Sequence, residues 1–418
     1  MSGKDAVVIQ DLAHPRWPFA FRTINFVGRA LVPLISLDEE NLIKAARKKT
    51  GLTDFGDESF RERMRILLSS VHADANPSPF GRFAARQFML QLLSNRLLIQ
   101  DTVNRHPEIL KQPIERPIII AGLPRTGTTH LHHLLSRDPN LRYLPYWESL
   151  EPILPENRKP KPGETDPRVK RCEQSIKMLH WVMPLFPRMH EMSVDGPHEE
   201  IQLLAIDFST MLFENMWYIP GYRDWYKAAD HTHAYEYLRM VLQVLQWMRG
   251  PRRWVLKSPQ HLDQYKPLLD AFPDARIIQT HRDPVRITAS MCTMDSYGKR
   301  MNNFPMDPKI NGRYWADRVE DLLRASMRDR HVIPKDQVMD VRFHEFIRDQ
   351  MGMIRRIYEF IGQPLTAEAE KAMQGYIEEN PAGKHGTVVY RLEDFGLDKD
   401  ERRSVLRAYQ EFFNVPDE

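Results

Sequence analysis

The stretch RPIIIAGLPRTGTTHLHHLL at 116–135 restricts the fold of this chain more than any other segment. Its isoleucine run is typical of a buried parallel strand, and a glycine-containing turn follows before a helix expected to begin near Thr129. A strand–turn–helix unit of this kind directs free backbone N–H groups and the positive end of a helix dipole at one point. The stretch therefore predicts an α/β fold, with a P-loop-like parallel sheet flanked by helices and a phosphate site.

The glycines of this turn, Gly122 and Gly127, have the spacing of a nucleoside-triphosphatase loop, but Thr128 replaces the lysine of that pattern. The positive charge lies inside the turn instead, at Arg125. A triphosphatase without the lysine lacks a contact to the β- and γ-phosphates, and no Walker-B aspartate is evident at a strand end. The pattern disfavours a P-loop kinase or NTPase, which stays open as an alternative function.

Further short apolar runs, separated by helical stretches, are expected to be strands of the same sheet: LRYLP, RWVLK, ARIIQTHR and QVMDVRF. Open α/β sheets bind ligands at the carboxyl ends of their strands. Lys257 and Arg282 lie at two such ends, and Ser290 lies about two turns into a helix expected to begin near Pro284. These residues predict a second phosphate site, so a nucleoside with two separate phosphate groups fits better than a triphosphate.

By composition, the chain divides into a helical N-terminal extension at 1–112 and an α/β domain at 113–418. Residues 150–235 are rich in proline, methionine and aromatic side chains at irregular spacing, which favours a helical substrate cap inserted beside the sheet. An ordinary helical subdomain core explains the same composition. The segment 16–37 mixes apolar residues with arginines. Peripheral contact with a membrane explains this mixture, as does packing across the domain or a place in the wall of an apolar pocket.

Composition limits the partners and the compartment. The chain has 418 residues and a formal net charge of +3, which argues against a protein that coats nucleic acid. The two cysteines, Cys172 and Cys292, cannot form a disulfide framework, and no secretory signal is evident. No apolar run reaches the roughly 18 residues of a transmembrane helix. We therefore expect a cytoplasmic protein, and the sequence leaves its oligomeric state unknown.

Together these motifs resemble those of the sulfotransferases that use 3'-phosphoadenosine 5'-phosphosulfate (PAPS), over roughly 115–300. GLPRTGTTHLHHLLSRDPNLR is similar to the family's 5'-phosphosulfate loop, and HRDPVRITAS to its 3'-phosphate motif. LKSPQHLDQYKPLLDAFPDARI resembles the tyrosylprotein-sulfotransferase branch and its bacterial relatives. The resemblance implies PAPS as co-substrate and adenosine 3',5'-bisphosphate (PAP) as product. A nucleotide-binding protein of the same fold that has lost catalysis is the non-enzymatic alternative.

The resemblance also implies roles for the matching residues. Arg125 corresponds to the loop cation that holds the 5'-phosphate and the bridging oxygen, and Lys257 to a lysine that contacts the bridging oxygen. Arg282 and Ser290 correspond to the 3'-phosphate ligands, and a basic–glycine segment near the C-terminus to a loop that closes over the nucleotide. The residues expected to bind the nucleotide are Arg125, Thr126, Gly127, Thr128, Thr129, Arg282, Ser290, Lys384, His385 and Gly386.

An attacking acceptor hydroxyl, or less readily an amine, needs a general base within hydrogen-bond reach. Glu148 is the first candidate, because related branches place a glutamate at the end of the second strand. The second is the pair Glu199 and Glu200 in GPHEEIQLL, which resembles a Glu-Glu-Ile-Gln stretch that carries the base in one heparan branch. A third candidate is His261, four residues after Lys257, and His198 and transfer assisted by the substrate itself stay open as further alternatives.

The implied reaction is an in-line displacement at sulfur, during which negative charge develops on the departing phosphate. Arg125 and Lys257 are expected to stabilise that charge, so no metal is required. The histidine-rich stretches HLHH and HTH lack the spacing and acidic partners of a zinc site. The apolar content of 150–235 favours a lipophilic, hydroxylated small-molecule acceptor.

Overall fold

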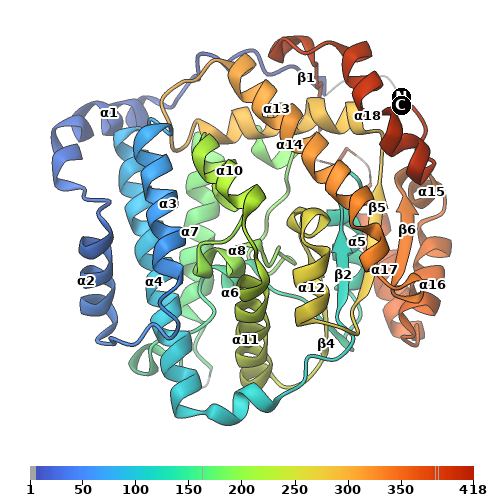
Figure 1. Ribbon diagram of the computed structural model, residues 1–418, viewed down its shortest axis with the longest axis horizontal. Coiled ribbons are helices and arrows are strands. Elements are labelled where there is room, and N and C mark those ends of the chain that lie inside the picture. The colour runs from blue at the N-terminus through green and yellow to red at the C-terminus, as the bar shows by residue number, and fades with distance from the viewer. Residues whose placement is uncertain (1–5, 162, 382, 385) are drawn as a thin grey trace.

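A parallel five-stranded sheet with the order β3-β4-β2-β5-β6 forms one side of the molecule in Figure 1. The computed structural model describes residues 6–161, 163–381, 383–384 and 386–418. All neighbouring strands of the sheet run in the same direction. This confirms the predicted α/β class, and each predicted run contains a strand. The strands are β2 (Ile118–Ala121), β3 (Leu141–Arg142), β4 (Arg253–Lys257), β5 (Arg276–His281) and β6 (Val338–Arg342).

The register of the central strands brings their carboxyl ends together. Ile120 of β2 pairs with Lys257 of β4, and Ala121 of β2 pairs with Gln279 of β5. The turn after β2, the end of β4 and the segment after β5 therefore meet at one edge of the sheet, where ligands bind in folds of this kind.

Side chains of β2 alternate between two buried clusters. Ile118 and Ile120 belong to the smaller cluster with the helices α5 (Thr128–Leu135), α16 (Gln350–Ile361) and α17 (Ala367–Glu379). Ile119 and Ala121 belong to the larger cluster, which reaches across the rest of the molecule. Because both faces of the sheet are covered at its centre, β2 is apolar without interruption rather than alternating.

Helices before residue 113 share the larger buried cluster with the sheet. Their hydrophobic side chains, including Leu93 and Leu97, lie in the same continuous core as Leu256 and Ile277 of the strands. The N-terminal part therefore packs against the α/β part without a core of its own. These helices are α1 (Phe19–Gly28), η1 (Arg29–Leu34), α2 (Glu39–Thr50), α3 (Phe60–Ala73), α4 (Pro79–Arg105) and η2 (Pro107–Lys111).

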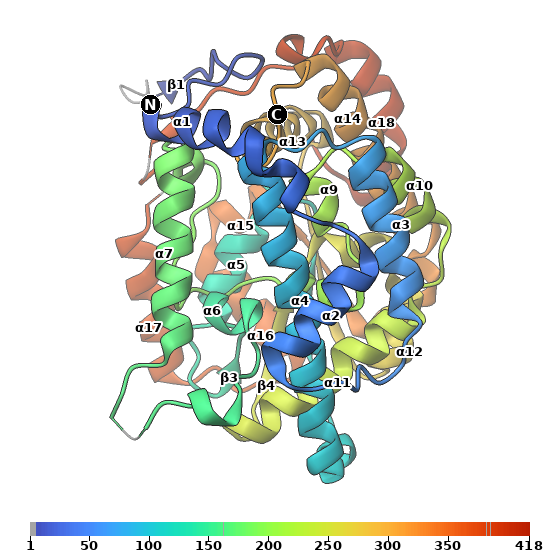
Figure 2. The same cartoon turned by 90° about the vertical axis from the view of Figure 1, so that its left-hand side faces the viewer.

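The segment 150–235 is helical, as predicted, and lies between the N-terminal helices and the sheet (Figures 1 and 2). Several of its aromatic side chains, including Trp217, Tyr222 and Tyr226, are fully buried in the larger core. Much of this segment is thus ordinary core. Its elements are η3 (Glu156–Arg158), α7 (Pro167–Val182), η4 (Phe186–Arg188), α8 (Ile201–Leu204), η5 (Ala205–Asp207), α9 (Leu212–Met216) and α10 (Pro220–Ala228).

The remaining helices connect or cover the strands. Near the N-terminus of the described chain, β1 (Ala6–Val7) pairs in parallel with β7 (Thr387–Val388). The other elements are α6 (Tyr146–Leu150), α11 (Thr232–Arg249), η6 (Pro259–Asp263), α12 (Tyr265–Ala271), α13 (Pro284–Lys299), α14 (Pro308–Arg328), η7 (Arg330–Val332), η8 (Lys335–Gln337), α15 (Phe343–Arg348), η9 (Glu393–Phe395) and α18 (Lys399–Phe413).

Over the described parts of the chain, no single helix is long and apolar enough to cross a membrane. One helix pair, Phe19–Leu34 with Glu39–Thr50, meets the length and composition criteria only when its two members are taken together, and it is bent by 97°.

Candidate active site

The turn between β2 and α5 has the geometry of an anion-binding loop. Gly127 adopts a φ of 90°, in the left-handed region that favours glycine, directly before α5. A Cβ on Gly122 would lie 2.1 Å from the hydroxyl of Thr280, so the close approach of the turn to β5 requires glycine. The Thr126 hydroxyl bonds that of Thr280 at 2.6 Å and the Leu123 carbonyl at 2.6 Å. The turn is thereby fixed to the sheet, with the first N–H groups of α5 at the carboxyl edge.

Arg125 lies in this turn with a strained backbone. Its φ of 73° is unusual for a residue with a side chain and costs about 1–3 kcal/mol. Its guanidinium donates to the carbonyl of Met189 at 2.8 Å and lies 5.9 Å from the ring centre of Tyr390. The cation is therefore held between the 183–200 segment and the C-terminal segment.

Arg282, directly after β5, contacts both the turn and the C-terminal residue. Its Nη1 donates to the Arg125 carbonyl at 2.9 Å, and its guanidinium lies 3.9 Å from the ring centre of Phe343. Its Nε and Nη2 donate to the carboxylate of Glu418 at 3.0 and 2.8 Å. Two donors of the Arg282 guanidinium are thus already bound to a carboxylate, in the way that they would bind a phosphate.

Ser290 lies on α13, and its side chain is buried. The residue is 3% exposed, and no residue among those the structure describes hydrogen-bonds its hydroxyl. Leaving a buried hydroxyl without a partner costs about 1–3 kcal/mol, so such a group in a native fold requires an explanation. A ligand oxygen that accepts a hydrogen bond from the Ser290 hydroxyl would explain it.

Lys257 ends β4 among three of the residues predicted to be catalytic. Its ammonium is paired with the carboxylate of Glu199, and its backbone N–H donates to Glu200 at 2.8 Å. The second Glu200 oxygen pairs with Nε2 of His261, whose Nδ1 lies 2.8 Å from the hydroxyl of Tyr235. Glu200 and His261 are fully buried, so they support the end of β4 from behind.

A cavity opens between α5 and the segment 190–199. The charged residues, the histidines and the threonine of its lining are Thr129, His133, His190, Glu191, His198, Glu199 and Lys257. Burial, reinforced by the charges of Lys257 and Arg125, lowers the pKa of His190 to about 3. Burial, reinforced by Arg137 and Lys257, lowers the pKa of His133 to about 4. These imidazoles are neutral at pH 7, and the cavity joins Thr129 of α5, the lysine and the carboxylates of Glu191 and Glu199.

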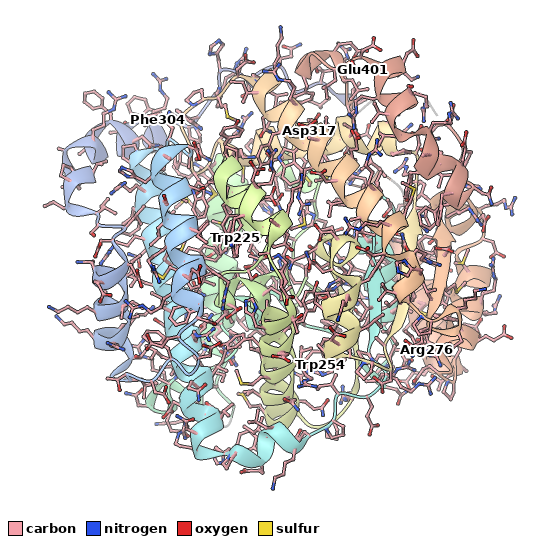
Figure 3. The ribbon with its side chains drawn as sticks, in the orientation of Figure 1. Trp225, Trp254, Arg276, Phe304, Asp317 and Glu401 are labelled. Atoms are coloured by element: carbon pink, nitrogen blue, oxygen red, sulfur yellow. The ribbon has the colours of Figure 1, made fainter. Side chains whose placement is uncertain are left out.

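Glu148 lies outside that cavity. Its carboxylate pairs with Arg142 at 3.1 Å and with Arg249 at 3.1 Å, and the residue is 2% exposed. The guanidinium of Arg142 in turn lies 4.2 Å from the ring centre of Trp254, near the start of β4 (Figure 3). Both oxygens of this first candidate base are therefore engaged in ion pairs, away from the end of β4 that carries Lys257.

The basic–glycine segment predicted to close over the nucleotide is partly described. Lys384 donates to the side chain of Asn380 at 2.9 Å. Gly386 has a φ of 81°, and a Cβ there would lie 2.5 Å from the guanidinium of Arg188. Four residues on, Tyr390 contacts Arg125. The segment thus passes close to the phosphate turn, and His385 lies outside the described residues.

The histidines at 130–133 have separate surroundings. His130 Nε2 bonds the side-chain oxygen of Gln350 at 2.7 Å, and the His133 ring stacks on Tyr376 at 5.5 Å. In the described ranges, no group of three or more histidine, cysteine, aspartate or glutamate side chains is arranged to hold a metal ion.

Sequence patterns did not indicate His133 or His190 as part of the cavity, or Glu418 as the partner of Arg282. His198, which also lines the cavity, directly precedes the Glu199–Glu200 pair, so the sequence pattern that indicated the pair also pointed to this histidine. The fold and this edge define a P-loop-like α/β protein in which a glycine-containing turn, two arginines and a buried lysine lie at the carboxyl edge of the sheet.

The comparisons with known proteins agree with that class. The model of the sulfotransferase family matches residues 117–367, and the chain belongs to this family. It is similar to the crystal structure of sulfotransferase STF9 from Mycobacterium avium, at 32% identity and a TM-score of 0.80, over 90% of this chain and 97% of that one. It is also similar to STF1 from Mycobacterium tuberculosis, at 30% identity and a TM-score of 0.77, over 88% and 98% of the two chains.

A curated relative carries a more specific name. The chain is 27% identical over 267 residues to the omega-hydroxy-beta-dihydromenaquinone-9 sulfotransferase Stf3 of Mycobacterium bovis. The match covers 59% of this chain and 62% of the length of Stf3. The predicted family is thus confirmed, while the likeness to the tyrosylprotein branch stays a resemblance.

Proposed function

We propose that this protein transfers a sulfonate group from PAPS to a hydroxyl group of a lipophilic small molecule. The observation that carries the proposal is the meeting of the phosphate turn, Lys257 and Glu199 in one cavity, with a second anion site at Arg282 and Ser290. Membership of the sulfotransferase family supports the same reaction.

The two anion sites suit the two phosphates of PAPS. The N–H groups at the start of α5 and the Arg125 side chain bind the 5'-phosphosulfate, since the turn is rigid and ends at a helix N-terminus. Arg282 binds the 3'-phosphate in place of Glu418, and the Ser290 hydroxyl gains the partner that it lacks. The Gly386–Tyr390 segment covers the nucleotide from the side of Arg125.

We propose Glu199 as the general base, because it lines the cavity and contacts Lys257, whereas Glu148 does neither. The acceptor oxygen forms a bond to sulfur while the bond between sulfur and the bridging oxygen of the 5'-phosphate breaks. Glu199 accepts the hydroxyl proton, and PAP departs with the electron pair of the broken bond. Lys257 turns from Glu199 toward the bridging oxygen and, with Arg125, stabilises the developing charge.

Glu200 and His261 act as positioning residues in this account. Glu200 accepts a hydrogen bond from the Lys257 backbone at 2.8 Å, and His261 and Tyr235 complete a buried chain behind it. Such a chain of hydrogen bonds fixes the end of β4, and therefore the backbone position of Lys257, before the substrate binds.

The acceptor side of the cavity is formed by residues 190–199 of the 150–235 segment, which we propose as the substrate cap. Helices before residue 113 are an extension packed on the α/β domain at 113–418. Neutral histidines at the cavity favour an uncharged acceptor over an anionic one. The relative Stf3 is named for a hydroxylated menaquinone derivative, which agrees with a hydroxylated lipophilic acceptor.

The experiment is incubation of the purified protein with PAPS labelled in the sulfonate group and an extract of host lipids. We expect label to move into an organic-phase product, and the Lys257→Met variant to leave it on the nucleotide. Label that stays on PAPS with the wild-type protein, while PAP still binds, supports an inactive nucleotide-binding protein instead. Hydrolysis of ATP with Mg²⁺ supports the kinase or NTPase alternative.

A further inference from the structure

The helices α1 and η1 present an apolar surface to solvent. Their outward side chains include Phe19, Phe26 and Leu34, which are 82%, 72% and 79% exposed. Together with these, Ile24, Val27 and Leu31 form what we call the α1–η1 surface. Exposed apolar groups of this size, contiguous along one segment, mark interaction sites on soluble proteins.

The body of the protein holds this segment in its outward orientation. Phe21 and Asn25 are the buried residues of α1. The Phe21 ring packs 5.0 Å from that of Phe80, and Asn25 accepts a hydrogen bond from the Phe80 N–H at 3.0 Å. A Cβ on Gly28 would lie 3.0 Å from the Pro79 side chain, so the end of α1 fits closely against the start of α4. The exposed face is thus a fixed surface of the fold.

The charged side chains of the segment that carries the α1–η1 surface, between Asp11 and Asp38, have one sign. No aspartate or glutamate occurs from Leu12 to Leu37, whereas Arg16, Arg22 and Arg29 lie there with exposed side chains. An apolar helix face bordered by arginines is complementary to the interface of an anionic bilayer, where the arginines meet lipid phosphates. In a two-fold contact with a second copy, two patches with the same positive charge would come together, which disfavours that occupant.

The surface continues toward the cavity through α7. The Phe21 ring lies 6.1 Å from that of Trp181 on α7, and Trp181 is itself 41% exposed. Figure 2 shows α1 lying across the upper end of α7. Beyond that end, the Phe186 ring lies 5.9 Å from that of His190, which lines the cavity. An acceptor that leaves the bilayer at this surface therefore meets the segment that forms the cavity wall.

We propose that the α1–η1 surface docks on an anionic lipid bilayer and that the protein takes its lipophilic acceptor from that bilayer. The second half of this statement rests on the proposed function, and the first half stands on the surface alone. The apolar side chains enter the interface, and the arginines bind the headgroups. Arg29 also lies 5.9 Å from the ring centre of Phe304, next to α1 in Figure 3, which places this aromatic ring at the border of the surface.

Flotation with vesicles tests docking directly. We expect the wild-type protein to float with phosphatidylcholine vesicles that contain phosphatidylglycerol, about tenfold more than with phosphatidylcholine alone, and less at high salt. The triple variant Phe19→Ser, Phe26→Ser, Leu34→Ser removes exposed side chains, so it keeps the wild-type melting temperature and loses flotation. The matched control Phe412→Ser removes a side chain that is 55% exposed on α18, and it floats like wild type.

Failure of wild type to float with anionic vesicles overturns the proposal, as does a triple variant that floats like wild type. A third outcome also overturns the proposal: the wild-type protein is a dimer, the triple variant is a monomer, and neither floats. That result assigns the surface to a second copy of the chain. Titration of the triple variant with PAP separates the two proposals. If the triple variant binds PAP like wild type but no longer floats, docking is supported. If the wild-type protein floats but does not bind PAP, only the proposed function is overturned.

Discussion

The ammonium of Lys257 is paired with the carboxylate of Glu199 at the end of β4, and the two side chains are 4% and 16% exposed. Thr129, in the first turn of α5, lines the same cavity. The residues that we propose as the stabilising cation and as the general base thus hold one another in the unliganded protein. In the proposed mechanism, a phosphosulfate that attracts the lysine releases the carboxylate for the acceptor, which couples nucleotide binding to activation of the base.

Replacing Lys257 removes the charge beside the bridging oxygen. We expect Lys257→Met to lower the rate of sulfonate transfer by about 10²–10⁵-fold, by analogy with arginines that stabilise phosphoryl transfer. PAP affinity changes much less, since the phosphates themselves bind elsewhere. Single-turnover measurements with labelled PAPS check this. Lys266→Met is the control, because Lys266 forms an exposed pair with Asp270 and should keep the wild-type rate; equal rates in both variants contradict the assignment.

Matched glutamine variants distinguish the candidate bases. Glu199→Gln keeps a polar partner for Lys257 and should lower turnover about 10²–10⁴-fold. Glu148→Gln removes the shared charge between Arg142 and Arg249, so it should lower the free energy of unfolding by about 3 kcal/mol and leave turnover per folded molecule unchanged. Chemical denaturation and kinetics measure both effects. Loss of turnover in Glu148→Gln, with turnover retained in Glu199→Gln, would assign the role of base to Glu148.

Ser290 allows a test in which stability and binding move in different directions. Ser290→Ala deletes a buried hydroxyl without a partner, so the unliganded protein should be as stable as wild type or more stable by about 1 kcal/mol. PAP affinity should fall several-fold. Ser326→Ala deletes a buried hydroxyl that donates to the Leu323 carbonyl at 2.8 Å, so it should lose about 1 kcal/mol of stability and keep PAP affinity. Identical behaviour of the two variants argues against a phosphate at Ser290.

Glu418 competes with any phosphate that binds Arg282. The carboxylate accepts from Arg282 at 2.8 Å and lies 3.5 Å from Arg286, so an incoming 3'-phosphate must displace it. Glu418→Gln should therefore raise PAP affinity by about tenfold, or about 1.4 kcal/mol. Calorimetric titration measures the change, with Glu411→Gln, an exposed glutamate of α18, as control. A weaker affinity in Glu418→Gln would mean that Arg282 does not receive the phosphate.

The cavity histidines make stability depend on pH. The pKa of His190 is about 3 and that of His133 about 4 in the folded protein, both below the unfolded value. As pH falls from about 6.5 toward 4, the unfolded chain binds protons that the folded protein does not, so stability falls by up to about 1.4 kcal/mol per pH unit for each histidine. Urea denaturation across this range should show a flatter slope for His190→Gln. The control His72→Gln, on the exposed side of α3, should retain the wild-type slope; a flatter slope there instead contradicts the role of burial.

The elements around the site could be predicted because local sequence determines them. The isoleucines of β2 are buried on both faces of the sheet. Gly122 lies where the turn approaches β5 closely, and Gly127 has a positive φ. Lys257 and Arg282 follow apolar runs whose strands pair with β2, so their placement at one edge follows from parallel topology. Patterns of this kind depend on neighbours within a few residues, which is what a sequence displays.

Pairs of side chains far apart in the chain could not be predicted. Glu148 and Arg249 are 101 residues apart, and Arg282 and Glu418 are 136 apart, so no periodicity links them. Glu148 lies in the short helix α6 after β3, where the family resemblance implies a base, and only the arginines packed around it show that its oxygens are occupied. Likewise, the position of His190 in the cavity depends on the path of the whole 183–200 segment.

Calorimetric titration of the wild-type protein with PAP in the presence of EDTA tests the central claim most directly. The two anion sites that we propose, built from a helix N-terminus, arginines and an unpartnered hydroxyl, need no metal to hold the nucleotide. We predict one PAP bound per chain without Mg²⁺, and no measurable binding of ATP with Mg²⁺ under the same conditions. Binding of ATP with Mg²⁺ and none of PAP would contradict the account.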